Sequence, residues 1–334
     1  MKIAIVKLSA LGDIVHAMAV IQFIKMHDKN VEIDWVIEEC FSGLLDYHPD
    51  INKIHKVNIK KAKQKQSLIK LIREFRNIRK FGPYDIVIDM QGLIKSALVS
   101  RLIPSKSTIG FDKFSIREKL ASFFYSKTFQ YGYDENIVER NISLIAFALE
   151  LNISKKNNII ALPFLYTSEE YSNTNLSSDK KNIVLIPGAS HQSKCYPASS
   201  LAKLATLIDA NFLIIWGNSK EKILAEEIKT LASNVSICEK LTIHSLKSLI
   251  SKVDLVIGPD TGPTHIAWAL NVASITLFGP TPGFRNSCTT DINRIIESKS
   301  IVNPHKINKN DYSIKDIKVD DIVKISHVLL KLNK

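Results

Sequence analysis

Short apolar runs alternate with helical patterns along nearly the whole chain, and this alternation limits the possible folds more than any other feature. Seven runs have the length and composition of strands that are buried in a parallel sheet. They are IAIV (residues 3–6), IDWVI (33–37), DIVID (85–89), NIVLIP (182–187), FLIIWG (212–217), DLVIG (254–258) and SITLFG (274–279). Strand, turn and helix repeated in this order predict an α/β protein.

The chain divides into two halves of this kind. Its 334 residues, of which 45% are hydrophobic, are enough for two domains with separate cores. The polar stretch TSEEYSNTNLSSDKKN (167–182) has no periodicity and is rich in Ser, Thr and Asn, so it predicts a linker. We expect one domain at 1–175, a second at 176–318 and a final helical segment at 319–334. Apolar residues also recur at helical spacing within 68–78.

Composition excludes several classes of protein. No stretch approaches the ~18 consecutive apolar residues of a membrane-spanning helix. Lys7 and Asp13 interrupt the first apolar run, so we also expect no signal peptide and a cytosolic protein. The four cysteines form no C-x-x-C pair, which predicts neither a disulfide framework nor a zinc site.

Positive charge is concentrated in one segment. The formal net charge is +12, and residues 51–84 hold eleven Lys or Arg against the single acid Glu74, a surplus of +10. This surplus indicates a polyanion or an anionic membrane surface as partner, although solvated helix faces carry such runs too. We expect no nucleic acid, because only Phe75 and Tyr84 interleave the bases and Phe75 falls on the apolar helix face.

Candidate ligand groups follow the predicted strands, because two domains of this class bind ligands at the carboxyl ends of their strands. IPGASHQSKCYP (186–197) combines a small-residue turn with Ser190 and Lys194, which suit a phosphate. Glu221 follows a Gly-Asn-Ser turn, where a carboxylate either grips a ribose diol or caps a helix.

The stretch GPDTGPTHIAWAL (258–270) is the third such loop. Asp260, Thr261 and Gly262 form a turn, and Pro263 stands where a helix should begin. Exposed amides at a helix start favour a phosphate, while Asp260 and His265 offer partners for sugar hydroxyls. A purely structural cap is the alternative.

In the first half, KLSALGDIVHAM (7–18) follows the first strand. It lacks the G-x-G-x-x-G pattern, so a nicotinamide cofactor loses its main support, and no D-x-D motif for a divalent cation lies near a strand end. Asp13 stands at the start of a helix. It is either a cap or a carboxylate that takes a proton from an incoming hydroxyl.

Five segments in this order resemble the ADP-heptose:lipopolysaccharide heptosyltransferases of glycosyltransferase family 9, most closely the heptosyltransferase I branch. They are LSALGDIVHAMAVI, DWVIEECF, DMQGLIKSALVSRLI, REKLASFFYSK and GPDTGPTHIAWAL. The resemblance implies a GT-B fold, in which two Rossmann-like α/β domains face across a cleft. It also implies inverting transfer of L-glycero-D-manno-heptose from ADP-heptose to Kdo2-lipid A, without metal or cofactor, at the cytoplasmic face of the inner membrane. Heptosyltransferase II, or another acceptor, is the alternative.

The resemblance also implies roles for individual residues. Domain 176–318 would bind the donor, with Ser190 and Lys194 on the diphosphate, Glu221 on the ribose and Leu241 at the adenine. In the third loop, the side chains of Asp260 and His265 would bind the heptose. The backbone amides of Thr261 and Gly262 would bind phosphate.

Domain 1–175 would bind the acceptor. The resemblance implies that Asp13 is the general base for the Kdo hydroxyl. A basic cluster and one arginine would meet the acceptor's phosphates and carboxylates: Lys60, Lys61, Lys63 and Arg140. The cluster belongs to the segment that the charge count singles out. The final segment, 319–334, would pack back towards the first domain.

Overall fold

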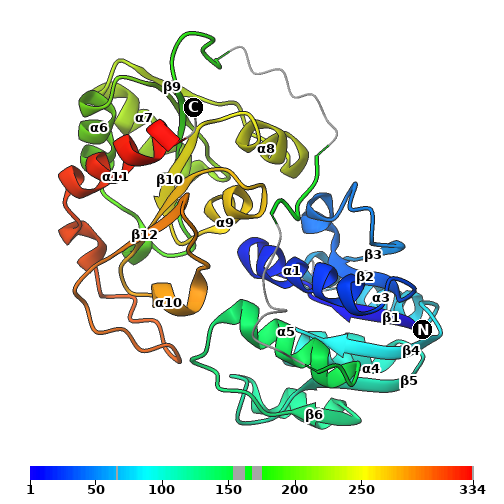
Figure 1. Cartoon of the computed structure of the whole chain (residues 1–334). Helices are drawn as coiled ribbons and strands as arrows, with labels where there is room; N and C mark the ends of the chain where they lie inside the picture. Colours follow the sequence, from blue (N-terminus) through cyan, green and yellow to red (C-terminus); the bar gives the residue numbers. More distant parts are fainter. Residues whose placement is uncertain (65–66, 153–161, 168–174, 333–334) are drawn as a thin grey trace. The chain divides into compact units, whose positions relative to one another are not determined.

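The computed structural model describes residues 1–64, 67–152, 162–167 and 175–332. The chain separates into two compact units, Met1–Phe164 and Leu165–Lys334, each built on a six-stranded parallel sheet (Figure 1). The predicted fold class is therefore confirmed. The units divide between Phe164 and Leu165, whereas the sequence predicts a boundary near residue 175. In the part of the chain that is described, no helix is long and apolar enough to cross a bilayer.

The first unit has the strand order β3-β2-β1-β4-β5-β6. Its strands are β1 (Lys2–Val6), β2 (Glu32–Glu38), β3 (Lys53–Val57), β4 (Tyr84–Asp89), β5 (Ser105–Phe111) and β6 (Lys127–Phe129). Its α-helices are α1 (Leu11–His27), α2 (Ile59–Gln64), α3 (Leu68–Ile78), α4 (Ile94–Leu102) and α5 (Ile137–Ala148). Two 3₁₀ helices complete it, η1 (Glu39–Leu44) and η2 (Lys119–Phe124).

The second unit repeats this order as β9-β8-β7-β10-β11-β12. Its strands are β7 (Asn182–Leu185), β8 (Asn211–Ile214), β9 (Val235–Ile237), β10 (Leu255–Pro259), β11 (Ser274–Phe278) and β12 (Asn293–Glu297). Its helices are α6 (Ala198–Leu207), α7 (Ser219–Leu231), α8 (Ile243–Ile250), α9 (Gly262–Ala269), α10 (Gly283–Asn286) and α11 (Val319–Leu332). The 3₁₀ helices are η4 (Gln192–Lys194) and η5 (Ser313–Asp316).

Helices cover both faces of each sheet. In the first unit α1 packs with α5, while α3 packs beside α4 and α4 beside η2. Helix α1 connects β1 to β2, and α4 connects β4 to β5, so the two connections run in opposite directions along the sheet. Because both connections are right-handed, the two helices lie on opposite faces of the sheet. The core under α3 contains Val57, Ile78 and Val87.

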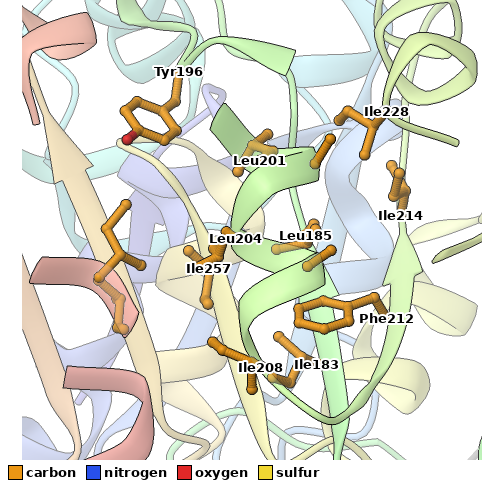
Figure 2. Close-up of a cluster of buried hydrophobic side chains, with 14 of the residues drawn as sticks. Ile183, Leu185, Tyr196, Leu201, Leu204, Ile208, Phe212, Ile214, Ile228 and Ile257 are labelled. Carbon is orange, nitrogen blue, oxygen red and sulfur yellow. The ribbon is translucent and has the colours of Figure 1, made fainter. Parts of the chain in front are cut away.

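The core of the second unit lies between its sheet and the helices α6, α7 and α11. Figure 2 shows side chains of β7, β8, β10, α6 and α7 that meet there, among them Leu185, Phe212, Ile257, Leu204 and Ile228. α11 packs on α6, β10 and β11 of this unit. The expected packing of the final helix towards the first domain stays a prediction.

Candidate active site

The loops that follow β7 and β10 lie side by side at the carboxyl edge of the second sheet. β7 and β10 pair directly, with Leu185 opposite Ile257. The amide of Ile186 continues the pairing and donates to the carbonyl of Ile257 at 2.9 Å. The chain leaves the two strands in opposite directions, to β8 and to β11. Doubly wound domains bind their ligands at such a switch point.

A buried cluster centred on Asp260 joins these loops. Lys194 Nζ donates to Asp260 Oδ2 at 2.8 Å, and His265 Nε2 lies 3.0 Å from Asp260 Oδ1. The hydroxyl of Thr281 donates to Oδ2 at 3.0 Å, and Asn286 Nδ2 approaches the same oxygen at 3.4 Å. The structure therefore brings together three residues that the sequence predicts for one site from two separate loops.

The cluster keeps a charged pair at the strand ends. Burial alone raises the pKa of Asp260, but the charge of Lys194 and the hydrogen bond from His265 outweigh it and hold this pKa well below the usual range. Asp260 and Lys194 are each 8% exposed. Since an ammonium group has three donors, Lys194 can bond Asp260 and a phosphate oxygen at the same time.

Helix α9 begins directly after Asp260. Thr261 is its N-cap, and Gly262 and Pro263 occupy the first two helical positions. The hydroxyl of Thr264 donates to the carbonyl of Thr261 at 2.6 Å, which stabilises the first turn. A helix start attracts anions through its amides and its dipole. This geometry suits the phosphate contact of Thr261 and Gly262, which stays a prediction.

Glu221 lies in the first turn of α7, against the loop that follows β7. Its carboxylate accepts hydrogen bonds from the amide of Gly217 and from Asn218 Nδ2, both at 2.6 Å. A Cβ at Gly188 would stand 2.1 Å from Glu221 Cγ, so the two segments approach this closely only because residue 188 is glycine. The N-cap of α7 is Asn218, so Glu221 holds the turn before the helix rather than capping it. Its ribose contact stays a prediction.

Two further predicted donor contacts lie in loops of the second unit. Ser190 is exposed in the loop after β7. Leu241 is half-buried in the segment between β9 and α8. Both therefore follow strands of this sheet, but their contacts with diphosphate and adenine stay predictions.

The first sheet has the equivalent switch point, between β1 and β4. The amide of Met90 donates to the carbonyl of Val6 at 3.1 Å, and Lys7 Nζ donates to the carbonyl of Met90 at 3.0 Å. Gln91 Oε1 accepts from the amide of Leu8 at 2.7 Å. These bonds tie together the loops that follow β1 and β4.

Asp13 lies in the first turn of α1, next to these loops. Its Oδ2 accepts a hydrogen bond from the amide of Ala10 at 3.2 Å, so the capping role is present. The side chain is exposed at the carboxyl edge of the sheet, where an acceptor hydroxyl could reach it. Proton transfer to Asp13 stays a prediction.

The basic cluster lies on α2, at the same edge. Buried Glu38 accepts from the amide of Lys60 at 3.0 Å and from Lys95 Nζ at 2.9 Å, which holds the start of α2 in place. The side chains of Lys60 and Lys61 are exposed. The side chain of Lys63 lies outside the described part of the structure.

Arg140 is buried, at 3% exposure, and its guanidinium binds backbone carbonyls. Nη2 donates to the carbonyl of Ser115 at 2.8 Å, and Nη1 donates to those of Tyr131, at 3.1 Å, and Gly132. The group also lies over the ring of Phe111, 4.5 Å from its centroid. These contacts anchor the segment between β5 and α5, and a direct contact of Arg140 with an acceptor stays a prediction.

Several residues of both edges escaped the sequence prediction. Thr281 and Asn286 follow β11, and both approach Asp260. Glu38 ends β2, and Gln91 and Lys95 follow β4. Each stands at the carboxyl end of a parallel strand, so applying the strand-end rule to every predicted strand is the signal that finds them.

Comparison with known proteins identifies the family of the chain. The model of glycosyltransferase family 9 (heptosyltransferase) matches residues 70–312. The chain is 39% identical to lipopolysaccharide heptosyltransferase 1 of Campylobacter coli, over 97% of this chain and 98% of that protein. It is 30% identical to lipopolysaccharide heptosyltransferase 1 of Escherichia coli K12, over 85% of this chain and 89% of that protein.

The fold has close neighbours among solved structures. E. coli heptosyltransferase WaaC with ADP gives a TM-score of 0.80 at 23% identity, over 98% of this chain and 100% of that one. E. coli ADP-heptose lps heptosyltransferase II gives 0.74 at 20% identity, over 99% of both chains. Two parallel-sheet units with this strand order and these structural neighbours define the GT-B fold. The chain belongs to glycosyltransferase family 9, the heptosyltransferases.

Proposed function

We propose that the chain transfers L-glycero-D-manno-heptose from ADP-heptose to the Kdo residue of Kdo2-lipid A. The observation that carries this proposal is the pairing of Lys194 with Asp260 beside the start of α9, because an ammonium group and a helix start suit a diphosphate. Relatives named lipopolysaccharide heptosyltransferase 1 support the sugar. Structural neighbours solved with ADP and with ADP-2-deoxy-2-fluoro heptose support the nucleotide.

The second unit would hold the donor. Ser190, Lys194 and the amides of Thr261 and Gly262 would bind the diphosphate, and Glu221 would hold the ribose. Leu241 would contact the adenine. Asp260 and His265 would meet heptose hydroxyls, in addition to the bonds that they make within the cluster.

The reaction would be a single displacement at the anomeric carbon. Asp13 would take the proton of the Kdo hydroxyl while the hydroxyl oxygen forms the new bond to C1 of the heptose. The bond from C1 to the phosphate oxygen breaks as the new one forms, and ADP leaves with the electron pair. Attack opposite the leaving group inverts the configuration. Lys194 and the start of α9 would stabilise the charge that develops on the departing diphosphate.

The first unit would hold the acceptor at the cytoplasmic face of the inner membrane. Lys60 and Lys61, with Lys63, would face its phosphates and carboxylates. Their exposure on α2 agrees with this role for the first two. An anionic acceptor and anionic lipids would both be attracted by the +10 segment.

A donor and acceptor panel with mass analysis of the product tests the proposal. We expect one added heptose when ADP-heptose is combined with Kdo2-lipid A, and no product with UDP- or GDP-linked sugars. Transfer only to an acceptor that already carries one heptose would instead indicate a heptosyltransferase II. Donor binding without transfer to any acceptor would contradict the catalytic proposal.

A further inference from the structure

Helix α3 presents large apolar side chains to solvent. Leu68 is 76% exposed, Ile69 74% and Ile72 52%. These residues share the first two turns of the helix. The inward side of α3 contacts the core of the first unit through other residues, namely Leu71, Phe75 and Ile78. The outward trio therefore contributes little to that core, and folding alone does not account for it.

Basic side chains continue the same outward stripe. In a helix, residues four apart are neighbours on one face, so Ile72 is followed by Arg76 and Ile69 by Arg73. Both arginines are exposed, as is Lys70. Glu74 is the single acid of residues 51–84. The outward face of α3 is thus apolar over its first turns and cationic over its last ones.

The neighbouring elements extend this surface. α3 packs beside α4, and α4 packs beside η2. Ile94 begins α4 and is 41% exposed, and η2 exposes Leu120 at 62% and Phe123 at 78%. Because helices in right-handed crossovers run antiparallel to their strands, α3 and α4 both begin near the carboxyl edge. Exposed apolar groups therefore gather along the edge that carries Lys60 and Lys61.

Charge decides which partner fits this face. A symmetric contact between two copies would bring the +10 segment against itself, which like charges oppose. An anionic bilayer offers negative headgroups to the bases and an apolar layer directly beneath them. Helices with an apolar stripe and a basic flank lie in this interface without crossing the membrane.

We propose that the outward face of α3 is a membrane-docking surface. Leu68, Ile69 and Ile72 enter the interfacial layer of an anionic phospholipid bilayer, while Arg73 and Arg76 bind headgroup phosphates. Docking in this way brings the carboxyl edge of the first sheet to the membrane surface. Its benefit for catalysis rests on the proposed lipid-linked acceptor, but the binding itself does not.

Flotation of the intact protein with vesicles tests this surface. We expect binding to phosphatidylcholine vesicles that contain about one third phosphatidylglycerol, and weak binding to pure phosphatidylcholine. Full burial of one Leu or Ile changes an equilibrium constant by about tenfold or more. The triple variant Leu68→Ser/Ile69→Ser/Ile72→Ser should therefore bind the mixed vesicles at least ~10-fold more weakly. Leu207→Ser/Leu231→Ser, two exposed leucines of the second unit, is the matched control and should bind normally.

A fluorescent variant reports insertion directly. Ile69→Trp should shift to shorter emission wavelength on mixed vesicles and should be quenched by lipids brominated on their acyl chains. The same substitution at Leu231 should show neither effect. Both positions are exposed, at 74% and 54%, so neither change should prevent folding.

Three results would overturn the proposal. The first is wild-type protein that does not bind anionic vesicles, and the second is a triple variant that binds them as wild type does. The third is a triple variant whose vesicle binding is unchanged but which is a monomer where the wild type is an oligomer. The last would assign the face to a second copy of the chain. Turnover of a deacylated, water-soluble acceptor separates this proposal from the proposed function, because the triple variant should keep that activity. If the wild-type protein also fails to turn over this soluble acceptor, that result contradicts the proposed function but not the membrane-docking proposal.

Discussion

Asp260 shows how one side chain organises a site. Four polar groups approach its two oxygens, and two of them, on Lys194 and His265, come from residues predicted for donor binding. The sequence predicts both as ligand groups because they follow strands that end at one edge. It does not predict that they contact Asp260, because a contact between loops depends on the final course of each backbone.

Lys194→Ala should weaken ADP-heptose binding at least ~10-fold and lower turnover as well, because a hydrogen bond to a charged group is worth about 1.5–3 kcal/mol. Calorimetric titration with the donor measures the first effect. Removing the ammonium also leaves Asp260 without its buried cation, so the variant should lose stability, and its melting temperature must be measured.

Two other lysine variants complete this experiment. Lys180→Ala removes an exposed pair with Asp209 in the same unit and should change neither the affinity nor the stability appreciably. Lys194→Arg keeps the charge and should recover part of the donor affinity. If Lys194→Ala folds and binds the donor normally, Lys194 is not a phosphate ligand.

Asp13→Asn should reduce kcat at least ~10²-fold, the lower range for a positioned general base, with donor affinity unchanged. The amide side chain of this variant retains an oxygen that can accept from the backbone N–H of Ala10, so the helix cap and the melting temperature should survive. Steady-state kinetics with saturating donor measure the loss. A variant with nearly normal kcat would leave Asp13 with its capping role alone.

At the scale of elements, the sequence predicts the central strands and misses the outer ones. All seven apolar runs correspond to strands of the two sheets, and the α3 and α11 patterns correspond to helices. The missed strands are β3, β5, β6, β9 and β12. Four of them are edge strands of the two sheets, and β5 lies next to an edge strand. In β3, the exposed Lys53 and Lys56 interrupt the apolar pattern. Apolar runs detect strands that are covered on both faces, and outer strands are not.

Helix periodicity likewise predicts α3 but not its exposure. Leu68 and Ile72 fit the apolar spacing that normally marks a buried stripe, yet both face solvent. A periodic pattern gives the width of an apolar face, not how much of it the core covers. The uncovered part of this face is the surface that we assign to the bilayer.

Two buried carboxylates of the first sheet should give opposite dependences of stability on pH. Burial would raise the pKa of Asp34, but hydrogen bonds from His55 and Tyr84, the latter at 2.6 Å, lower it below 3.8. Burial raises the pKa of Asp89, and the hydrogen bonds from Gln91 and Tyr125 offset this only in part.

The sign follows from which state binds more protons. Between the folded pKa of Asp34 and about 3.8, the unfolded state is more protonated, so this carboxylate's stabilisation is present above that range and lost as pH falls through it. Between about 3.8 and the folded pKa of Asp89, the folded state is more protonated, so stability falls as pH rises. Each group contributes a slope of at most about 1.4 kcal/mol per pH unit.

Urea unfolding from acid to neutral pH, with Asp34→Asn and Asp89→Asn, measures both slopes. Asp34→Asn should be less stable than wild type at pH about 7 and should approach it below about 3.8. The stability of Asp89→Asn relative to wild type should be highest at neutral pH, because there the buried charge of Asp89 destabilises the wild-type protein. Parallel pH profiles for the two variants would contradict this assignment.

At the scale of the whole molecule, the two units share one strand order and one kind of site. Each places a candidate carboxylate at the switch point between its first and fourth strands, Asp13 after β1 beside β4 and Asp260 after β10 beside β7. The sequence predicts this because central strands and strand-end loops are visible in it. The strand-end loops do not show which unit binds the donor and which the acceptor, because both edges carry a carboxylate and a lysine. That assignment rests on the family resemblance.

Charge distribution separates the two sites in an experiment. Lys60→Glu/Lys61→Glu/Lys63→Glu should raise KM for Kdo2-lipid A and leave ADP-heptose affinity within about threefold, because the proposed donor site is built from the second unit. Lys306→Glu/Lys309→Glu/Lys318→Glu changes the net charge equally but alters exposed lysines of that unit, and should leave the acceptor KM unchanged.

Salt supplies an independent reading of the same contacts. Screening acts over about 8 Å at physiological ionic strength, so exposed lysines should lose attraction as salt rises. The wild-type acceptor KM should therefore increase with salt, and that of the Lys60/Lys61/Lys63 variant should increase less. Equal losses for both substrates would indicate misfolding, and no loss for either would leave these lysines as a solvated face. We expect the acceptor-selective result, because the surplus lies almost wholly in residues 51–84, on the unit that would receive the anionic acceptor.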